Sequence, residues 1–199
     1  MKELTATMQM LDTVDVKAFA RAAGLELDDH QAHVLTDMLS VNPGTSTWRT
    51  MEITAPQQTA AVDTFVVRAL IGLLVLGENV LWSVHRSTAT KAAHGRLSTG
   101  LRALGTATEG APNRVEVDGI PVKIRNANGY EGAERLDTGA RIRFACRRYA
   151  GAVRGYNADL LVIDEAGDYT AAQHKEHLPS VACSRNPQIV YIGVEGKSW

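Results

Sequence analysis

An uninterrupted apolar run that ends in two acidic residues places the strongest constraint on how this chain can fold. The segment 160–163 reads LLVI and is followed directly by Asp164 and Glu165. A strand that is apolar at every position is typical of a parallel sheet buried on both faces. In open α/β sheets, ligands bind at the carboxyl ends of the strands. The sequence therefore predicts two adjacent carboxylates at the binding edge of such a sheet.

Two neighbouring carboxylates at this position favour phosphate chemistry. Asp164 can hold Mg²⁺, directly or through water, and Glu165 can polarise a water molecule against a phosphate. This is the Walker B arrangement of nucleotide-driven motors. The alternative is structural: Asp164 caps a following helix and Glu165 is a surface residue.

The segment that would hold the nucleotide phosphates has unusual chemistry. Residues 54–62 lie between an expected strand and a long apolar helix, where free N–H groups and the helix dipole favour an anion. A working loop needs glycines, a lysine and a Ser/Thr hydroxyl, as in GxxxxGK[ST]. The chain has no such motif, and segment 54–62 contains neither glycine nor lysine. An ordinary strand-to-helix turn is therefore the alternative here.

Hydrophobic periodicity predicts alternating strands and helices along most of the chain, which implies a mostly parallel sheet with right-handed crossovers. We expect a three-layer α/β fold with added antiparallel hairpins. The expected helices cover 14–23, 29–39, 62–76, 88–104 and 171–178, and the expected strands cover 48–54, 79–84, 160–163 and 188–192. Segment 109–113 is expected to be a loop. Hairpins are expected within 114–144, with turns at 118–119, 128–129 and 138–139.

Composition narrows the class of protein. The 199 residues carry a net charge of −1, so any contact with nucleic acid must be local rather than driven by a global basic field. The two cysteines form no CxxC motif, which disfavours a zinc site or a disulfide scaffold. The longest apolar run, 69–76, is too short to cross a bilayer, so we expect no membrane association. We expect a flexible leader over 1–13 and a single domain over 14–199.

Three further positions are candidates for function, each with a structural alternative. The amide of Gln31 can donate to and accept from one adenine edge, or can be a solvated helix residue. Arg154, in a Gly/Ala-rich loop, is a candidate arginine finger or a surface side chain. His85 follows the strand 79–84, where a coupling or DNA contact competes with a simple helix cap by Ser87 or Thr88.

In combination, these segments resemble the ATPase domain of the large terminase subunit of tailed bacteriophages, the motor that drives DNA into the capsid. The likeness runs from Leu27 to Ile192. The matching segments, in chain order, are LDDHQ at 27–31, PQQTAAV at 56–62, LGE at 76–78, SVH at 83–85, IRNANG at 124–129, GARIRF at 139–144, Arg154-Gly155, DEA at 164–166 and NPQIVY at 186–191.

The resemblance implies that the three-layer α/β fold is of the P-loop NTPase type, and it implies a role for each matched position. Asp164 would hold Mg²⁺, Glu165 would activate water, Gln31 would contact the adenine of ATP, and Arg154 would act as the finger. The phosphate loop would comprise Gln57, Gln58, Thr59, Ala60, Ala61 and Val62. Gln57 stands where the family has arginine, Ala60 where it has glycine, Ala61 where it has lysine and Val62 where it has Ser/Thr. The loop is thus naturally degenerate, deliberately altered, or completed by another subunit.

The resemblance also implies ATP and Mg²⁺ as cofactors and double-stranded DNA, the portal protein and the small terminase subunit as partners. It further implies self-association into a ring during packaging. The expected location is the cytoplasm of the infected bacterial host, at the portal vertex during packaging. We expect the 199 residues to contain the ATPase domain alone, without the family's nuclease domain. Two rival functions remain: a pseudo-ATPase that acts as a binding or assembly module, and a helicase-like accessory domain.

Overall fold

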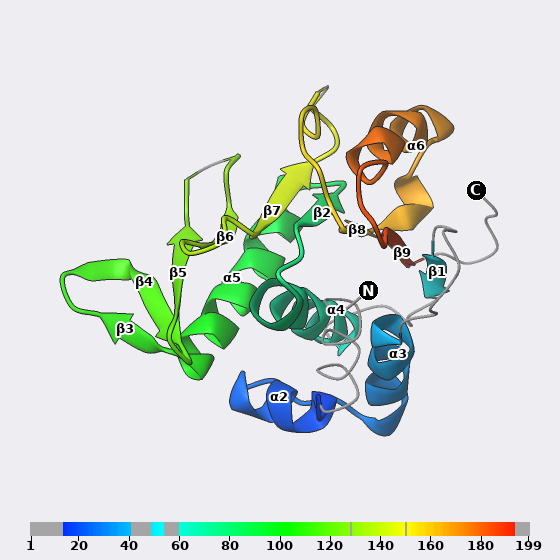
Figure 1. The fold of residues 1–199 in the computed structure, drawn as a ribbon. Helices are drawn as coiled ribbons and strands as arrows, with labels where there is room; N and C mark the ends of the chain where they lie inside the picture. The colour runs from blue at the N-terminus through cyan, green and yellow to red at the C-terminus, as the bar shows by residue number, and fades with distance from the viewer. Residues whose placement is uncertain (1–13, 41–48, 54–59, 128, 150, 194–199) are drawn as a thin grey trace.

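A nine-stranded sheet forms the centre of the molecule (Figure 1). The computed structural model describes residues 14–40, 49–53, 60–127, 129–149 and 151–193, with the backbone alone at 49–53 and 60–61. The strand order is β1-β9-β8-β2-β7-β6-β5-β4-β3. The strands are β1 (Arg49–Ile53), β2 (Val80–Val84), β3 (Thr106–Thr108), β4 (Ala111–Val117), β5 (Ile120–Arg125), β6 (Gly132–Arg135), β7 (Arg141–Cys146), β8 (Leu160–Ile163) and β9 (Gln188–Ile192).

Five of the strands, from β1 to β7 in this order, are all parallel and make up the first half of the sheet. Strands β2, β8 and β9 are buried at every position, as their mostly apolar sequences predict. Alternate residues enter two separate cores. In β8, Leu160 and Val162 join the larger core cluster, whereas Leu161 and Ile163 join the smaller one.

Helices on both faces of this half complete three layers. The larger cluster packs beneath α4 (Ala60–Ile71) and α5 (Ser87–Leu104), and α2 (Val16–Ala22) and α3 (Asp29–Leu39) add a further cluster against α4. The other face is covered by α6 (Ala171–His177) and the connection that precedes β8 (Figure 1). The predicted three-layer α/β fold is therefore confirmed.

The second half of the sheet is a run of antiparallel hairpins from β7 to β3. The predicted hairpins of 114–144 are confirmed, with Asp118 and Gly119 at positive φ in the β4–β5 turn. The prediction of a loop over 109–113 is partly wrong, because β4 begins at Ala111 and pairs with β3. Ala111-Pro112-Asn113 lacks the alternation of a strand, so only the pairing with β3 reveals it.

The long helix after β1 changes its winding before it ends. Helix α4 continues as a π-helical segment over Gly72–Leu76 and stops at Gly77, which has φ 66°. Arg68 is buried and forms a bidentate ion pair with Glu78, at 2.6 and 3.1 Å. A Cβ atom at Gly72 would lie 2.6 Å from Glu78 Oε2, so only glycine leaves room for this pair. The same guanidinium donates to Gln188 Oε1, which ties α4 to the start of β9.

Candidate active site

The carboxyl ends of the parallel strands meet at one edge, and this edge holds the two carboxylates. Asp164 and Glu165 follow the last residue of β8 directly. Strand β9 lies between β1 and β8, which places the chain leaving β1 about 10 Å, or two strand spacings, from Asp164. The strand-to-helix connection from β1 to α4 therefore leaves the sheet at the edge where ligands bind in α/β folds.

Asp164 is held in place at the end of β8 by its own backbone and by β2. Its N–H donates to Ser83 O at 2.9 Å. Its carboxylate accepts the Glu165 N–H at 2.8 Å and Trp82 Nε1–H at 3.3 Å. Burial raises the pKa of Asp164, and the bonds from Trp82 and the Glu165 amide only partly offset this effect. Because burial disfavours the charged carboxylate, a cation that approaches the ionised form of Asp164 would be bound favourably.

Glu165 combines backbone strain with an unsatisfied carboxylate. Its φ of 51° and ψ of 49° lie in the left-handed region, which is uncommon for a residue other than glycine. Its Oε2 atom is buried and has no hydrogen-bond partner within the part of the chain that the structure describes. Such outliers collect at functional sites, where the surrounding structure sustains them. Glu165 therefore has the geometry of a functional side chain.

A buried arginine clamps the backbone of this acidic turn. Arg147 lies just beyond β7, two strands from β8, and is only 5% exposed. Its guanidinium donates to the carbonyl oxygens of Asp164 (2.7 Å), Glu165 (2.7 Å) and Ser83 (3.1 Å). Two charge-assisted bonds to the turn, and a third to β2, oppose relaxation of the strained Glu165 backbone. Nothing in the sequence around Arg147 predicts this role, because it depends on the strand order that brings β7 near β8.

A second polar link connects β2 with the covering helix. Ser83 Oγ lies 2.9 Å from His177 Nε2, and His177 Nδ1 lies 2.6 Å from Gln173 O. Since a carbonyl can only accept, Nδ1 carries the proton and Nε2 accepts from the Ser83 hydroxyl. Burial lowers the pKa of His177, which keeps the ring neutral. This link anchors α6 against the strand that supports Asp164.

The predicted phosphate loop lies mostly outside the described residues. This applies to Gln57, Gln58 and Thr59, whereas Ala60 and Ala61 form the first residues of α4. Val62 is half-buried and packs against the larger core cluster. It occupies the helix position where a Ser/Thr hydroxyl was expected by resemblance, and its side chain cannot ligate a metal ion. The predicted nucleotide contacts of this segment stay predictions.

The other two candidate residues have identifiable local contacts. Gln31 completes a capping box at the start of α3: Gln31 Oε1 accepts the Asp28 N–H at 2.9 Å, and Asp28 Oδ1 accepts the Gln31 N–H at 2.8 Å. Its amide thus has a structural task, and its adenine contact stays a prediction. Arg154 is exposed, with its stem folded over Gly151. Within the described residues no hydrogen bond or ion pair joins Arg154 to the acidic turn.

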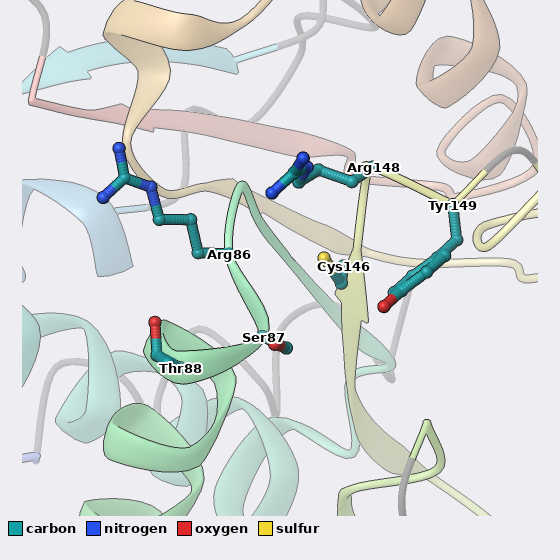
Figure 2. A pocket seen from close by; sticks show the side chains of 6 residues that line it. All are labelled: Arg86, Ser87, Thr88, Cys146, Arg148 and Tyr149. Atoms are coloured by element: carbon teal, nitrogen blue, oxygen red, sulfur yellow. The ribbon is translucent and has the colours of Figure 1, made fainter.

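A pocket of about 480 Å³ opens at the ends of β2 and β7 (Figure 2). It lies on the side of β8 opposite β1, and it is lined by Arg86, Ser87, Thr88, Cys146, Arg148 and Tyr149. The prediction that Ser87 or Thr88 caps the helix is wrong, because Arg86 is the N-cap and no side chain caps α5. Two arginines without a lining carboxylate favour an anionic group here and disfavour a metal ion.

The described residues fit a magnesium ion that is shared with a nucleotide. They contain no cluster of three potential metal ligands. Mg²⁺ is commonly bound by one or two carboxylates together with substrate phosphates and water, so such a cluster is not required. Asp164 offers a buried carboxylate, and the neighbouring Glu165 oxygen has no partner. The acidic turn therefore suits the ion, whereas the loop sequence lacks the usual phosphate-binding groups.

Solved structures share this architecture. The chain aligns with the large terminase of bacteriophage HK97 with a TM-score of 0.59 and 11% identity, over 84% of this chain and 33% of that one. The ATPase domain of the Thermus phage P74-26 large terminase gives 0.59 and 14%, over 90% and 69%. An arginine-to-alanine mutant of that domain gives 0.60 and 13%, over 90% and 70%. This chain has the fold of the phage large-terminase ATPase domain.

The terminase-type fold extends over most of the chain, but the chain spans only about a third of the HK97 protein. Against the large terminase of a thermophilic bacteriophage, it covers 39% of that protein. No protein-family model matches the sequence, and no curated protein is detectably similar to it. No helix within the described residues is long and apolar enough to span a membrane.

Proposed function

We propose that this chain is the ATPase domain of a phage large terminase and couples Mg²⁺-dependent ATP hydrolysis to packaging of double-stranded DNA. The observation that carries the proposal is the strained acidic turn after β8, where Glu165 has a buried carboxylate oxygen without a partner. This turn lies at the binding edge of a sheet with terminase topology. The fold alone would not imply turnover, since function depends on the site.

Each residue of the turn has a distinct task in this proposal. Asp164 holds the Mg²⁺ ion, which would neutralise charge on the nucleotide phosphates when bound. Glu165 orients the attacking water and accepts its proton. Arg147 positions Glu165 through its backbone carbonyl rather than by contact with the substrate. Gln31 is the proposed adenine contact, which requires its amide to leave the capping box.

The missing loop lysine is the main difficulty for catalysis. Residues 57–62 provide no cation, so positive charge on the phosphates must come from elsewhere. Arg154 is exposed, carries no ion pair within the described residues, and is the proposed finger, acting within one subunit or between two. Removal of one such electrostatic group typically lowers kcat by about 10²–10³. We therefore expect slow turnover compared with a complete loop.

The proposed partners follow from the packaging role. They are double-stranded DNA, the portal protein, the small terminase subunit and further copies of this chain in a ring. The proposed location is the cytoplasm of the infected host, with the motor at the portal vertex during packaging. The absence of a spanning helix among the described residues is compatible with this location.

The test compares ATP binding and hydrolysis for the wild-type chain and Glu165→Gln. We expect ATP binding by calorimetry in the presence of Mg²⁺ and turnover that falls at least about 100-fold in Glu165→Gln. Glu26→Gln is the matched control, because Glu26 is exposed on a loop between α2 and α3. Wild-type turnover that survives Glu165→Gln would refute the assignment of Glu165.

A pseudo-ATPase is the second candidate function, and the chemistry of the loop favours it. Val62 packs on the core where a hydroxyl is expected, and the residue directly before it is Ala61 instead of a lysine. Such a chain would serve as a binding or assembly module without turnover. The variant Ala60→Gly/Ala61→Lys/Val62→Thr separates the two functions. Activity gained only in this variant would mean that the acidic turn is intact and that the natural loop is inactive.

A further inference from the structure

The arginine that holds the acidic turn carries a buried charge without a carboxylate partner. Arg147 forms no ion pair within the described residues, and its Nε atom has no hydrogen-bond partner there. Burial lowers the pKa of Arg147, so its surroundings disfavour the charged form. Its two terminal nitrogens donate only to the carbonyl oxygens of Ser83, Asp164 and Glu165. The support of this cation thus decides how firmly the turn is held.

An aromatic ring from the same turn supports the guanidinium. The centre of the Tyr169 ring lies 5.7 Å from the guanidinium carbon of Arg147, within the range of a cation–π contact, and Tyr169 is buried. Tyr169 follows the short 3₁₀-helix Ala166–Asp168, and its N–H donates to Ala166 O at 3.0 Å. The chain therefore turns back after Glu165 and places its own ring against the arginine that holds Glu165 O.

A ring suits this position better than a carboxylate would. The face of an aromatic ring attracts a cation but does not compete for its N–H groups as a carboxylate does. A carboxylate would draw the N–H groups of Arg147 away from the backbone, because arginine and a carboxylate form strong bidentate hydrogen bonds. The Tyr169 ring favours the charge and leaves these N–H groups directed at Asp164 O and Glu165 O.

Three further rings, from α6 and β9, hold the Tyr169 ring in place. The His177 ring lies 5.5 Å from it at 81°, and the His174 ring lies 6.0 Å from it at 83°, both in the edge-to-face geometry that aromatic pairs prefer. The Tyr191 ring lies 6.0 Å from it at 55°. A rotation of the Tyr169 ring away from the arginine would therefore displace side chains of both α6 and β9.

We propose that Tyr169 is a positioning residue for the reaction at the acidic turn: its ring orients the Arg147 guanidinium, which in turn fixes the main chain of Glu165. The inference rests on the proposed function for the role of Glu165 in hydrolysis. Glu165 O accepts both Arg147 Nη2–H at 2.7 Å and the Asp168 N–H at 3.1 Å. Without the ring, the first of these bonds loses its support and the strained main chain of Glu165 can relax. Because a group that activates water works only within a narrow range of positions, this relaxation slows the chemical step.

The first measurement compares kcat and KM for ATP hydrolysis in the wild type, Tyr169→Phe and Tyr169→Leu. We expect kcat to fall at least about tenfold in Tyr169→Leu while KM stays within about twofold, because the effect is on the position of Glu165. Tyr169→Phe keeps an aromatic face, so its kcat should stay within about threefold of the wild type. Tyr156→Leu is the matched control, since Tyr156 is also buried and lies beneath Arg141, away from the acidic turn. The control should keep the wild-type kcat.

The second measurement tests whether Tyr169 acts through Arg147. In an Arg147→Gln background, Tyr169→Leu should lower kcat by less than about twofold, because the guanidinium that the ring supports is already gone. Losses of kcat that multiply in the double variant would mean independent effects and would overturn the inference. Equal losses in Tyr169→Phe and Tyr169→Leu would also overturn it, because they would assign the effect to the hydroxyl group rather than to the ring.

The third measurement does not depend on turnover. Hydrogen exchange of the amides of residues 164–168 is followed in the free protein, where the Asp164 N–H is bonded to Ser83 O and the Glu165 N–H to the Asp164 carboxylate. Tyr169→Leu and Arg147→Gln should each speed this exchange about tenfold, whereas Tyr169→Phe and Tyr156→Leu should leave it near the wild-type rate.

Hydrogen exchange also separates this inference from the proposed function. The expected exchange pattern in a protein without ATP turnover would refute the proposed function and leave the link from Tyr169 through Arg147 to the main chain of Glu165 standing. Unchanged exchange in Tyr169→Leu would overturn the inference even if the wild-type chain hydrolyses ATP.

Discussion

The two halves of the sheet solve the problem of burial differently. The parallel half is covered on both faces, and its strands β2, β8 and β9 are buried throughout. The antiparallel half is covered on one face, so β4 alternates between buried and exposed residues. The first half holds its polar groups at the ends of strands, and the second holds them along a face. The difference indicates chemistry at an edge in one half and contact over an area in the other.

The largest effect is expected in the parallel half, where a charge is buried beneath the sheet. Arg68→Met leaves the carboxylate of Glu78 without its bidentate partner, and should lower the free energy of unfolding by about 3–5 kcal/mol. The double variant Arg68→Met/Glu78→Gln should recover part of this loss. Chemical denaturation of the three proteins measures it. A double variant no more stable than the single one would mean that the two residues act independently.

A smaller loss of stability with a larger loss of function is expected for the clamp on the acidic turn. Arg147→Lys keeps the charge but cannot reach the carbonyls of Ser83, Asp164 and Glu165 together, so we expect about 2 kcal/mol of destabilisation. If Glu165 is catalytic, kcat should fall by at least about tenfold while KM for ATP changes little. Arg148→Lys, at the neighbouring exposed position, is the control. A fall in kcat of equal size in Arg148→Lys would argue against the clamp.

The pH dependence of stability should contain separate contributions from a histidine on α6, which covers the parallel half, and a histidine on α5, which covers the antiparallel half. Burial lowers the pKa of His177, on α6, and of His94, on α5, from the ordinary value of 6.5. Below that value the unfolded chain binds protons that the folded chain does not, so stability is lost as the pH falls. Each histidine contributes at most about 1.4 kcal/mol per pH unit.

Thermal melts of the wild type, His177→Gln and His94→Gln between neutral and mildly acidic pH test this expectation. Each variant should lose stability less steeply than the wild type. We expect the slope of stability against pH to be shallower in both variants than in the wild type. A slope that changes only in His177→Gln would assign the acid sensitivity to the parallel half alone.

The smallest effect is a gain in stability in the antiparallel half. Arg114→Thr removes the like-charge pair with Lys123 and introduces a residue with high β-propensity, so the free energy of unfolding should rise by about 0.5 kcal/mol. A protein that loses stability on this change would show that the two cations are compensated within the chain.

The sequence predicts the parallel half better than the antiparallel half. Strands such as 160–163 are continuous apolar runs, and their burial follows from composition alone. The start of β4 lacks such a signal, because Pro112 and Asn113 lie where the register between β3 and β4 shifts. The like-charge contact between Arg114 and Lys123 depends equally on register, which a single sequence does not reveal.

The sequence predicted the two carboxylates of the candidate site but not the arginine that holds their backbone in place. Asp164 and Glu165 are marked by the apolar run before them. Arg147 and Arg148 are adjacent and chemically identical, yet one is 5% exposed and the other lines an open pocket. Their difference follows from the strand order β8-β2-β7, which places Arg147 within reach of the acidic turn. For Gln31, the DxxQ spacing at 28–31 does signal the capping box that the structure contains.

Strand β7 belongs to both halves, and this has a mechanical consequence. Arg141 and Arg143 of β7 stack on Tyr156, and Arg147, just beyond the same strand, donates to the carbonyls of the acidic turn. Six residues of extended chain, about 20 Å, separate the first contact from the last. A strand hydrogen-bonded on both sides is stiff along its length. A displacement of Arg141 along β7 would therefore also displace Arg147, and through its hydrogen bond the carbonyl of Glu165.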